Sequence, residues 1–324
     1  MFTNVCETMS ASIDELNKEK TSIARLSIAS NSVLVVAKLA VGLMIGSVSV
    51  ISEAIHSGID LVAALIAYYS VRKSSEPPDR EHSFGHGKFE NVSGAIEAIL
   101  IFVAALLIIY EAYQKLIHGV VLEDVSLGIG VMAVSVVINF FVSQKLMKTA
   151  KRTESIALEA DAWHLRTDVL TSLGIFAGLV AIKLTGITIL DPIFAIVVAL
   201  FILKAALELT IKSVKDLMDV NLPEDEVAEI ERIILDHSGK FAGFHELRTR
   251  RSGSDRFIDL HLVVSRDMSV EQAHKLVDHI EKDITDRFSR TSVITHVEPC
   301  DNDETCTNCQ AKECSKYVAP TEEP

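Results

Sequence analysis

An uninterrupted run of 20 uncharged residues, 125–144, constrains this chain more than any other feature of its sequence. A helix of that length rises about 30 Å, which matches the thickness of the hydrocarbon core of a lipid bilayer. Other segments are nearly as apolar, with only scattered polar interruptions. The sequence therefore predicts six membrane-spanning helices, at roughly 24–45, 48–72, 90–115, 125–145, 156–182 and 189–212.

The composition agrees with a chain that is divided into an apolar part and a polar part. Charged residues make up 23% of the chain, yet its mean hydropathy is +0.31. Both values are compatible only if apolar and charged residues are segregated along the sequence. The net charge of −13 argues against a nucleic-acid partner, because binding to phosphates requires basic patches. We therefore expect a protein that contacts the lipid bilayer and does not bind nucleic acid.

The basic residues of the loops predict the orientation in the membrane. They are concentrated in the connections after the second and fourth spans, as Arg72, Lys73, Arg80, Lys88, Lys145, Lys148, Lys151 and Arg152. Cytoplasmic loops are enriched in lysine and arginine. With six spans, both termini are then expected in the cytoplasm, and the protein is expected to be a multi-pass protein of the inner (plasma) membrane. Residues 1–21 are polar, so we do not expect them to form a cleavable signal peptide. The alternative, a large soluble helical protein, would not explain this asymmetry.

After residue 219 the pattern becomes that of a small α+β domain. The expected elements are a helix opened by Pro223, strands at 244–251 and 256–264, a helix from Ser269 to about Phe288, and a strand at 292–299. In the second strand, Ile258, Leu260 and Leu262 alternate with polar residues, so one face is expected to be buried. This αββαβ order predicts a three-stranded sheet with helices on one face.

Two identical motifs place ionisable residues inside predicted spans. His56 and Asp60 lie in the second span, and His164 and Asp168 in the fifth, each pair with H-x-x-x-D spacing. Residues four apart share one face of a helix, and such groups cost about 2.5–3.5 kcal/mol each at the centre of a membrane helix. Two imidazoles and two carboxylates suit tetrahedral Zn²⁺, and the carboxylates balance the charge of the ion. Two polar pairs that only hydrogen-bond between helices are the alternative.

A second candidate cation site lies in the loop between the second and third spans. Asp79, His82 and His86 occur within eight residues, and glycines at 85 and 87 allow the backbone to fold closely. A solvated loop that happens to hold two histidines explains the same spacing. Other polar residues of the spans either line a water-filled vestibule or lie near the membrane interface: Asn31, Lys38, Glu53, Glu97, Glu111, Asn139 and Asp161.

Together these motifs resemble the cation diffusion facilitator family, most closely its bacterial zinc/proton antiporters of the YiiP type. The resemblance spans roughly residues 20–300 and rests on the paired H-x-x-x-D motifs, residues 82–88 (HSFGHGK), 217–219 (LMD), 245–253 (HELRTRRSG) and 272–274 (QAH). It implies six transmembrane helices, a cytoplasmic metallochaperone-like α+β domain and a homodimer. It also implies that Lys88 and Asp219 form an ionic pair that locks the two protomers together near the membrane surface.

The resemblance further implies three groups of metal ligands. They are the transport site His56, Asp60, His164 and Asp168, the loop site Asp79, His82 and His86, and the cytoplasmic site His245, His261, His274, His296 and Glu298. The YiiP type has aspartate where this chain has His56, which favours zinc over iron or cadmium, and aspartate where it has Glu298. Strand alternation independently places His296 and Glu298 on one face, and His245 and His261 lie at comparable distances from the hairpin turn.

The expected function is efflux of divalent transition-metal cations, mainly Zn²⁺, by proton-coupled antiport with alternating access. Zn²⁺ would be both transported and regulatory, with protons as the counter-ion. A membrane metal sensor or scaffold, a facilitated uniporter, and Fe²⁺, Co²⁺ or Cd²⁺ as the cargo are the alternatives. We do not expect an enzyme, because the sequence has no H-E-x-x-H motif and the ligand set leaves no open position for water.

The sequence thus divides into a cytoplasmic tail (1–21), a transmembrane transport domain (22–219), a cytoplasmic metal-binding and dimerisation domain (220–300) and a flexible tail (301–324). Four of the five cysteines lie at the end of the chain, as Cys300, Cys306, Cys309 and Cys314. They form an auxiliary metal-binding tail or have no metal role, and both readings remain open.

Overall fold

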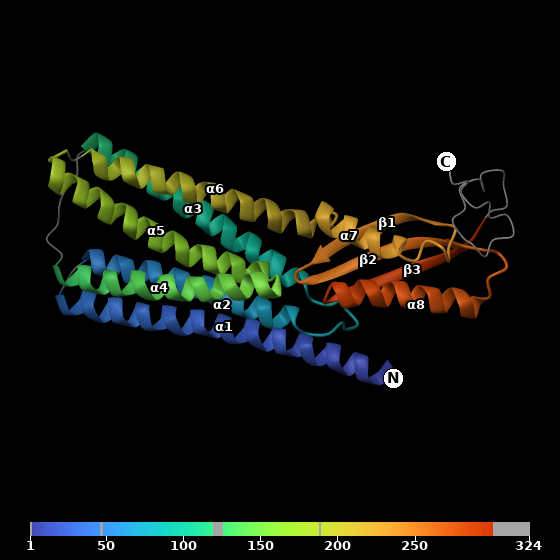
Figure 1. Ribbon diagram of the computed structural model, residues 1–324. Helices are drawn as coiled ribbons and strands as arrows, with labels where there is room; N and C mark the ends of the chain where they lie inside the picture. Colours follow the sequence, from blue (N-terminus) through green and yellow to red (C-terminus); the bar gives the residue numbers. More distant parts are fainter. Residues whose placement is uncertain (1, 46–47, 119–125, 188, 301–324) are drawn as a thin grey trace. The chain divides into compact units, whose positions relative to one another are not determined.

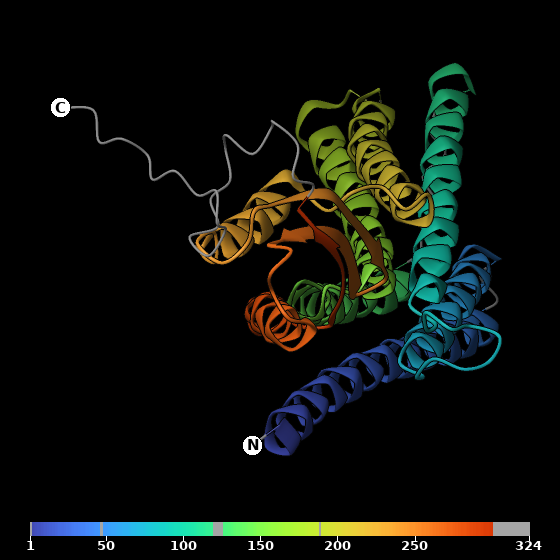
Figure 2. The same ribbon diagram turned by 90° about the vertical axis from the view of Figure 1, so that its right-hand side faces the viewer.

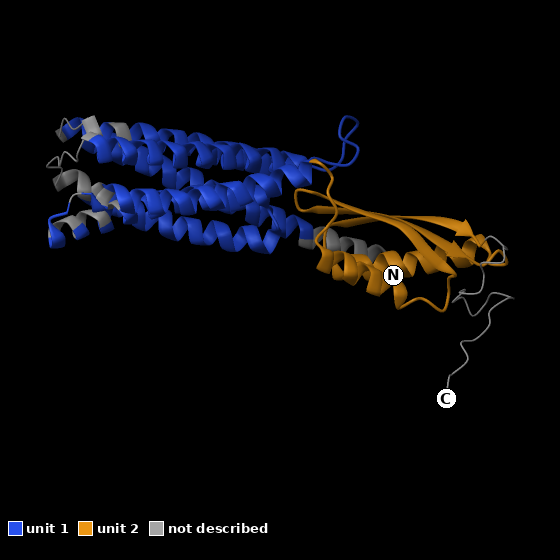
Figure 3. Ribbon diagram, turned by 90° about the horizontal axis from the view of Figure 1, so that it is seen from above, with its two compact units in different colours: residues 1–217 blue, residues 218–324 orange. Residues whose placement is uncertain are grey.

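The computed structural model describes residues 2–45, 48–118, 126–187 and 189–300, which form two compact units. The first unit, residues 1–217, is a bundle of long helices, and the second, residues 218–324, contains a small sheet with two helices (Figures 1 and 3). The helices of the bundle are α1 Phe2–Ile45, α2 Val48–Ser74, α3 Lys88–His118, α4 Ser126–Thr153, α5 Ile156–Thr185 and α6 Leu190–Leu217.

Each of the six predicted spans corresponds to one of these helices, but the helices extend further than the apolar segments. The largest difference is at the start, where α1 begins at Phe2, so that most of the predicted polar tail is helical. Neither glycine nor proline occurs between residues 2 and 41, so nothing local ends the helix before the apolar segment. Hydropathy locates the membrane-embedded part of a helix and not its ends.

Four of the helices are long and apolar enough over their described residues to cross a membrane. These segments are Ile13–Met44, Ala54–Ser74, Lys88–Ile117 and Pro192–Leu217. The remaining two helices, α4 and α5, are 28 and 30 residues long. Helix α5 carries four ionisable residues within the bundle: Asp161, His164, Arg166 and Asp168.

Small residues allow the helices of the bundle to pack closely. One buried cluster joins α1, α2, α4 and α5, and a second joins α3, α5 and α6, so α5 lies between the two halves of the bundle. Alanines such as Ala64, Ala98 and Ala160 are completely buried, whereas Val36 and Phe201 are exposed on the outside. Membrane helices associate through such close packing, because lipid already surrounds their apolar side chains.

A buried polar cluster joins four parts of the bundle at one end. Lys20 of α1 forms an ion pair with Glu90 of α3, with 2.8 Å between Nζ and Oε1. The same carboxylate accepts hydrogen bonds from Ser74 at the end of α2 and from Ser155 just before α5. Both charged side chains are 1% exposed, so their charges are compensated inside the protein rather than by water.

The second unit has the predicted αββαβ order, with α7 Glu224–Leu235, β1 Gly243–Ser252, β2 Asp255–Val264, α8 Val270–Arg287 and β3 Thr291–Pro299. The sheet order is β1-β2-β3, with β1 antiparallel and β3 parallel to β2. Ile258, Leu260 and Leu262 are fully buried against both helices, which cover one face of the sheet (Figure 2). The predicted capping box of Ser269 and Gln272 is present at the start of α8.

Strand register brings three histidines together on the opposite face of the sheet. His245 of β1 pairs with His261 of β2, which pairs with His296 of β3. A bulge follows His245, and Glu246 within it adopts a positive φ of 49°. Such a bulge redirects side chains away from strict alternation.

Candidate metal centre

The α2 and α5 motifs meet inside the bundle. The Nε2 atom of His164 lies 2.9 Å from Oδ1 of Asp60, and Nε2 of His56 lies 4.0 Å from the same oxygen. His56, Asp60 and Asp168 each offer a ligand atom within 4.8 Å of the others. Asp60 and His164 are buried, and His56 is exposed along the helix surface. The structure therefore brings the paired motifs into one cluster, whereas their helical spacing predicts only that each pair shares one face of its helix.

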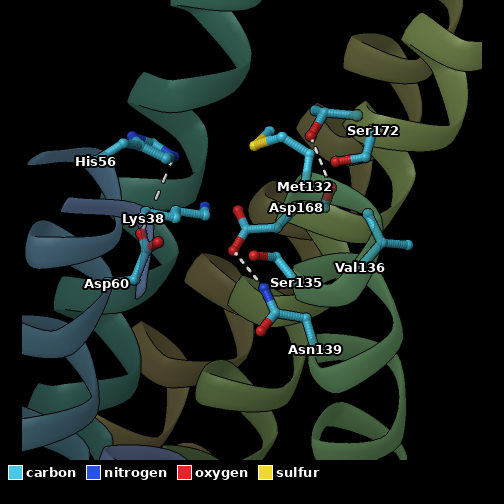
Figure 4. A pocket seen from close by; sticks show the side chains of 10 residues that line it. Lys38, His56, Asp60, Met132, Ser135, Val136, Asn139, Asp168 and Ser172 are labelled. Carbon is cyan, nitrogen blue, oxygen red and sulfur yellow. Dashed lines mark hydrogen bonds and ion pairs between the residues drawn. The ribbon is translucent and has the colours of Figure 1, made fainter. Parts of the chain in front are cut away.

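A cavity of about 90 Å³ adjoins this cluster (Figure 4). Its lining consists of Lys38, His56, Asp60, Met132, Ser135, Val136, Asn139, Asp168, Thr171 and Ser172. That volume accommodates an ion with some of its water, since one water occupies about 30 Å³ in the liquid. His164 lies behind Asp60 rather than in this lining. Three of the four predicted ligands thus face the cavity, and His164 contacts the carboxylate of one of them.

Helix α4 contributes polar groups that the H-x-x-x-D motifs do not include. Asn139 donates a hydrogen bond from Nδ2 to Oδ2 of Asp168, at 3.3 Å. Its own Oδ1 is buried and has no hydrogen-bond partner among the described residues. An unpartnered amide oxygen beside a carboxylate is a plausible oxygen ligand or water acceptor for a bound cation. Ser135 lies one turn before Asn139 on the same face and also lines the cavity.

The loop between α2 and α3 folds Asp79, His82 and His86 into one group. Asp79 Oδ1 lies 3.6 Å from His82 Nδ1, and its Oδ2 lies 3.2 Å from His86 Nε2. The backbone N–H of His82 donates to Asp79 and, with that of Glu81, holds the pKa of this carboxyl below its usual range, so that it is anionic at neutral pH. Gly85, with φ +84°, makes the turn that returns His86 to Asp79.

The environment of His86 distinguishes this loop from a solvated turn. It is 2% exposed, and neither of its ring nitrogens has a hydrogen bond of acceptable geometry among the described residues. An imidazole that is buried away from water without such partners loses hydrogen bonds and destabilises the fold. Its ring nitrogens are well suited to donate a lone pair to a metal ion.

The open face of the sheet carries the third group. Both carboxylate oxygens of Glu298 contact imidazole rings: Oε2 lies 3.0 Å from His245 Nε2, and Oε1 lies 2.9 Å from His261 Nδ1. The Nε2 atom of His296 lies 3.5 Å from the same Oε1. Burial alone would raise the pKa of Glu298, but the hydrogen bonds from His245 and His261 hold it below its usual range. A carboxylate shared by three imidazoles, each with a second ring nitrogen, is a suitable centre for one or two transition-metal ions.

One residue of this group was not predicted, and one predicted residue lies elsewhere. Glu246 approaches His261, with 3.6 Å between its Oε2 and Nε2 of the ring. Strand alternation would place Glu246 on the opposite face of the sheet from His245. The bulge after His245 turns the Glu246 side chain toward the face that carries His261. His274, in contrast, lies exposed on α8, where its Nδ1 is 3.6 Å from Asp278. Within this chain, His274 does not join the other four predicted ligands.

Two family models match the two units of this chain. The cation efflux transmembrane domain matches residues 24–218, and the cation efflux protein cytoplasmic domain matches residues 222–300. The chain belongs to the cation efflux (cation diffusion facilitator) family. It is accordingly a multi-pass membrane protein of a metal-cation efflux family, with a C-terminal cytoplasmic domain.

Relatives in this family match along most of their length. An uncharacterized transporter of Synechocystis is 36% identical over 82% of this chain and 86% of its own. The cation-efflux pump FieF of Yersinia pestis is 35% identical over 83% of this chain and 89% of its own. A solved metal-bound C-terminal domain of the CzcD transporter from Thermotoga maritima is 31% identical over 26% of this chain and 100% of its own, with a TM-score of 0.23.

Two further expectations concern residues outside these three groups: the ionic pair of Lys88 and Asp219, which the family resemblance implies, and the cysteine tail, which does not rest on that resemblance. Asp219 lies 3.4 Å from Arg250 of its own unit, measured from Oδ1 to Nη1, so the expected pairing with Lys88 of a second protomer remains untested. Of the terminal cysteines, Cys300 is partly exposed, and Cys306, Cys309 and Cys314 lie outside the described residues.

Proposed function

We propose that this chain exports Zn²⁺ from the cytoplasm in exchange for protons, through the cavity between α2, α4 and α5. The observation that supports this proposal best is the contact of the two H-x-x-x-D motifs at that cavity, where His56, Asp60 and Asp168 converge. Alternating access would expose this site to each side of the membrane in turn. The protein would lie in the inner (plasma) membrane with both termini in the cytoplasm.

The chemistry of the ligands favours Zn²⁺ among divalent cations. Imidazole nitrogen suits zinc, cobalt and related ions, whereas Mg²⁺ and Ca²⁺ prefer oxygen ligands alone. Asp60 and Asp168 supply the negative charge that a divalent ion needs in a medium of low dielectric constant. Fe²⁺, Co²⁺ and Cd²⁺ are weaker candidates for the cargo, and the transport measurement below compares them directly.

Electrostatics provides the reason for coupling to protons. A metal ion binds only to neutral imidazole and ionised carboxylate, so Zn²⁺ and protons compete for the same side chains. When the ion leaves, two carboxylates that face one small cavity repel each other and lose solvation. Uptake of protons relieves both costs, and the return half of the cycle then carries protons inward.

The loop and cytoplasmic groups would have a regulatory role. Zn²⁺ bound between β1, β2 and β3 would crosslink the strands of the cytoplasmic domain and stiffen its homodimer. The expected effect is on the rate of transport or on the metal concentration at which it begins, because neither group lines the transport cavity.

The decisive experiment measures Zn²⁺ flux in proteoliposomes with and without an imposed pH gradient, together with a dye that reports internal pH. We expect Zn²⁺ to accumulate against its gradient only when protons flow in the opposite direction. Mg²⁺ and Ca²⁺ should not move, and Mn²⁺ only weakly. Zinc flux that ignores the pH gradient would show a uniporter, and metal binding without any flux would show a sensor.

Variants of the site make the same experiment specific. Asp60→Ala and Asp168→Ala each remove one ligand and one negative charge, so we expect both to abolish Zn²⁺ flux without loss of membrane insertion or dimerisation. Glu208→Ala, which removes an exposed carboxylate of α6, is the matched control and should transport normally. Normal flux in both site variants would contradict the proposal.

A further inference from the structure

A lysine shares the transport cavity with the metal ligands. Lys38 of α1 is 6% exposed and lies in the lining of the cavity with His56, Asp60 and Asp168. Its ammonium donates a hydrogen bond to Ser57 Oγ of α2, at 2.8 Å. Figure 4 shows the side chain extending between Asp60 and Asp168. A lysine side chain thus occupies a space that has to admit a divalent cation.

The hydrogen bond to Ser57 shows which face of α2 the lysine head group approaches. Ser57 follows His56 directly and precedes Asp60 by three residues, so it lies on the face of α2 that carries the ligands. The other charged or titratable groups in the lining are His56, Asp60 and Asp168, with His164 against Asp60. Helix α4 contributes only uncharged lining residues, Met132, Ser135, Val136 and Asn139.

We propose that Lys38 is a tethered counter-ion of the transport site, which occupies the field of Asp60 and Asp168 when no metal is bound and competes with the metal for it. This inference rests on the proposed function, because it assumes that the cavity is where the cation binds. The lysine side chain is a compact charge on a flexible stem, so the ammonium can stay near the carboxylates or withdraw along the cavity. Its competition would keep the affinity low enough for the ion to be released on the far side.

The competition also bears on selectivity. The single positive charge of the lysine neutralises only one of the two carboxylates, so a divalent ion that displaces it still gains electrostatic stabilisation. Na⁺ or K⁺ gains none, because it brings no more charge than the lysine already supplies. Monovalent cations are therefore excluded without a steric filter. A divalent ion is admitted, but at reduced affinity, because the ammonium repels it from a short distance in a medium of low dielectric constant.

Lys38→Met tests the proposal, because it removes the charge and keeps an unbranched side chain of similar length. We expect the KM for Zn²⁺ flux to fall about tenfold, with a lower maximal rate because release becomes slower. Equilibrium binding of Zn²⁺ to the full-length protein should tighten by the same factor, measured on the binding step that Asp60→Ala eliminates. Lys38→Arg keeps the charge and should retain the wild-type KM.

A purely structural role for Lys38 predicts a different result. If the lysine only holds α1 against α2, Ser57→Ala and Lys38→Met would both reduce flux without lowering KM. In our proposal Ser57→Ala keeps the ammonium in the cavity and leaves KM near the wild-type value. Lys204→Met, at an exposed lysine of α6, is the control for loss of a positive charge and should have no effect.

The outcomes separate this inference from the function on which it rests. Wild-type KM and wild-type binding in Lys38→Met would overturn the role of the lysine while Zn²⁺ transport stands. If that variant does not fold, Lys38→Gln is measured in its place, and unchanged affinity there has the same meaning. Absence of Zn²⁺ flux in the wild-type protein would refute the proposed function instead.

Discussion

At the scale of single residues, the three metal groups differ in how their carboxylates are held. Asp79 is fixed by backbone N–H groups, Glu298 by two imidazoles, and Asp60 by the ring of His164. A carboxylate whose second shell orients it binds a metal ion with less loss of entropy. Glu298 is the most connected of the three, because it is the only contact that His245, His261 and His296 share among the described residues.

This makes Glu298→Gln the most informative substitution in the cytoplasmic domain. The amide keeps the shape but loses the charge, so we expect Zn²⁺ binding at this site to weaken at least about tenfold. Titration of Zn²⁺ into the full-length variant measures the effect. Asp283→Asn is the matched control, because its carboxylate also contacts a histidine, His237, but lies on α8 and outside the group on the sheet. Equal losses in the two variants would contradict a specific site at Glu298.

At the scale of elements, α5 is the helix on which the bundle depends. It contributes to both buried clusters of the bundle and carries His164 and Asp168. At one end of the bundle, the Lys20–Glu90 pair with Ser74 and Ser155 ties α1, α2, α3 and the residue before α5 together. A rearrangement that separates these helices during transport would have to break this ion pair. The strength of the pair therefore contributes to the free energy that such a motion requires.

Removal of the Glu90 charge should therefore destabilise the bundle strongly. In Glu90→Gln, the buried Lys20 loses its carboxylate partner, and breaking a buried pair in this way costs about 3–5 kcal/mol. Thermal unfolding of the detergent-solubilised protein should show a clearly lower midpoint. The control is Glu159→Gln, whose partner Lys212 is exposed, with an expected cost of about 0–1 kcal/mol. Similar midpoints for both variants would mean that the Lys20–Glu90 pair is not protected from water.

At the scale of the whole molecule, the proposed transport site and the candidate metal group of the sheet lie in different units of the chain. The cavity and its ligands lie within residues 1–217, and the histidine-rich sheet face lies within residues 218–300. Each unit has a core of its own, so each group of ligands is held by its own packing. We therefore expect changes in the second unit to alter the rate or threshold of transport, and loss of either cavity carboxylate, Asp60 or Asp168, to abolish it.

Truncation after residue 300 tests this separation at the end of the chain. The removed segment carries Cys306, Cys309 and Cys314 but none of the cavity ligands and none of the sheet residues. We expect the truncated protein to retain most of its Zn²⁺ flux in proteoliposomes, with the full-length chain as the reference. Loss of flux in a truncated protein that still inserts into the membrane would make the cysteine tail part of the mechanism.

Local patterns were sufficient to predict most of the elements and part of the sites. Alternation in β2, the capping box at Ser269 and the four-residue spacing of the H-x-x-x-D motifs each depend only on the geometry of one strand or one helix. The same geometry correctly placed His296 and Glu298 on one face of β3. The ends of α1 were less predictable, because the helix continues beyond the part that the membrane requires.

What the sequence determined by itself is therefore the identity of the elements and the face on which each ligand lies, since backbone periodicity sets both. Only the tertiary structure decided which faces meet. Packing of α1 and α4 against the motif helices brought Lys38 and Asn139 into the cavity, and placed His164 behind Asp60. A bulge turned Glu246 toward His261, and the position of α8 kept His274 away. These outcomes depend on contacts between residues far apart in the sequence, which no local pattern contains.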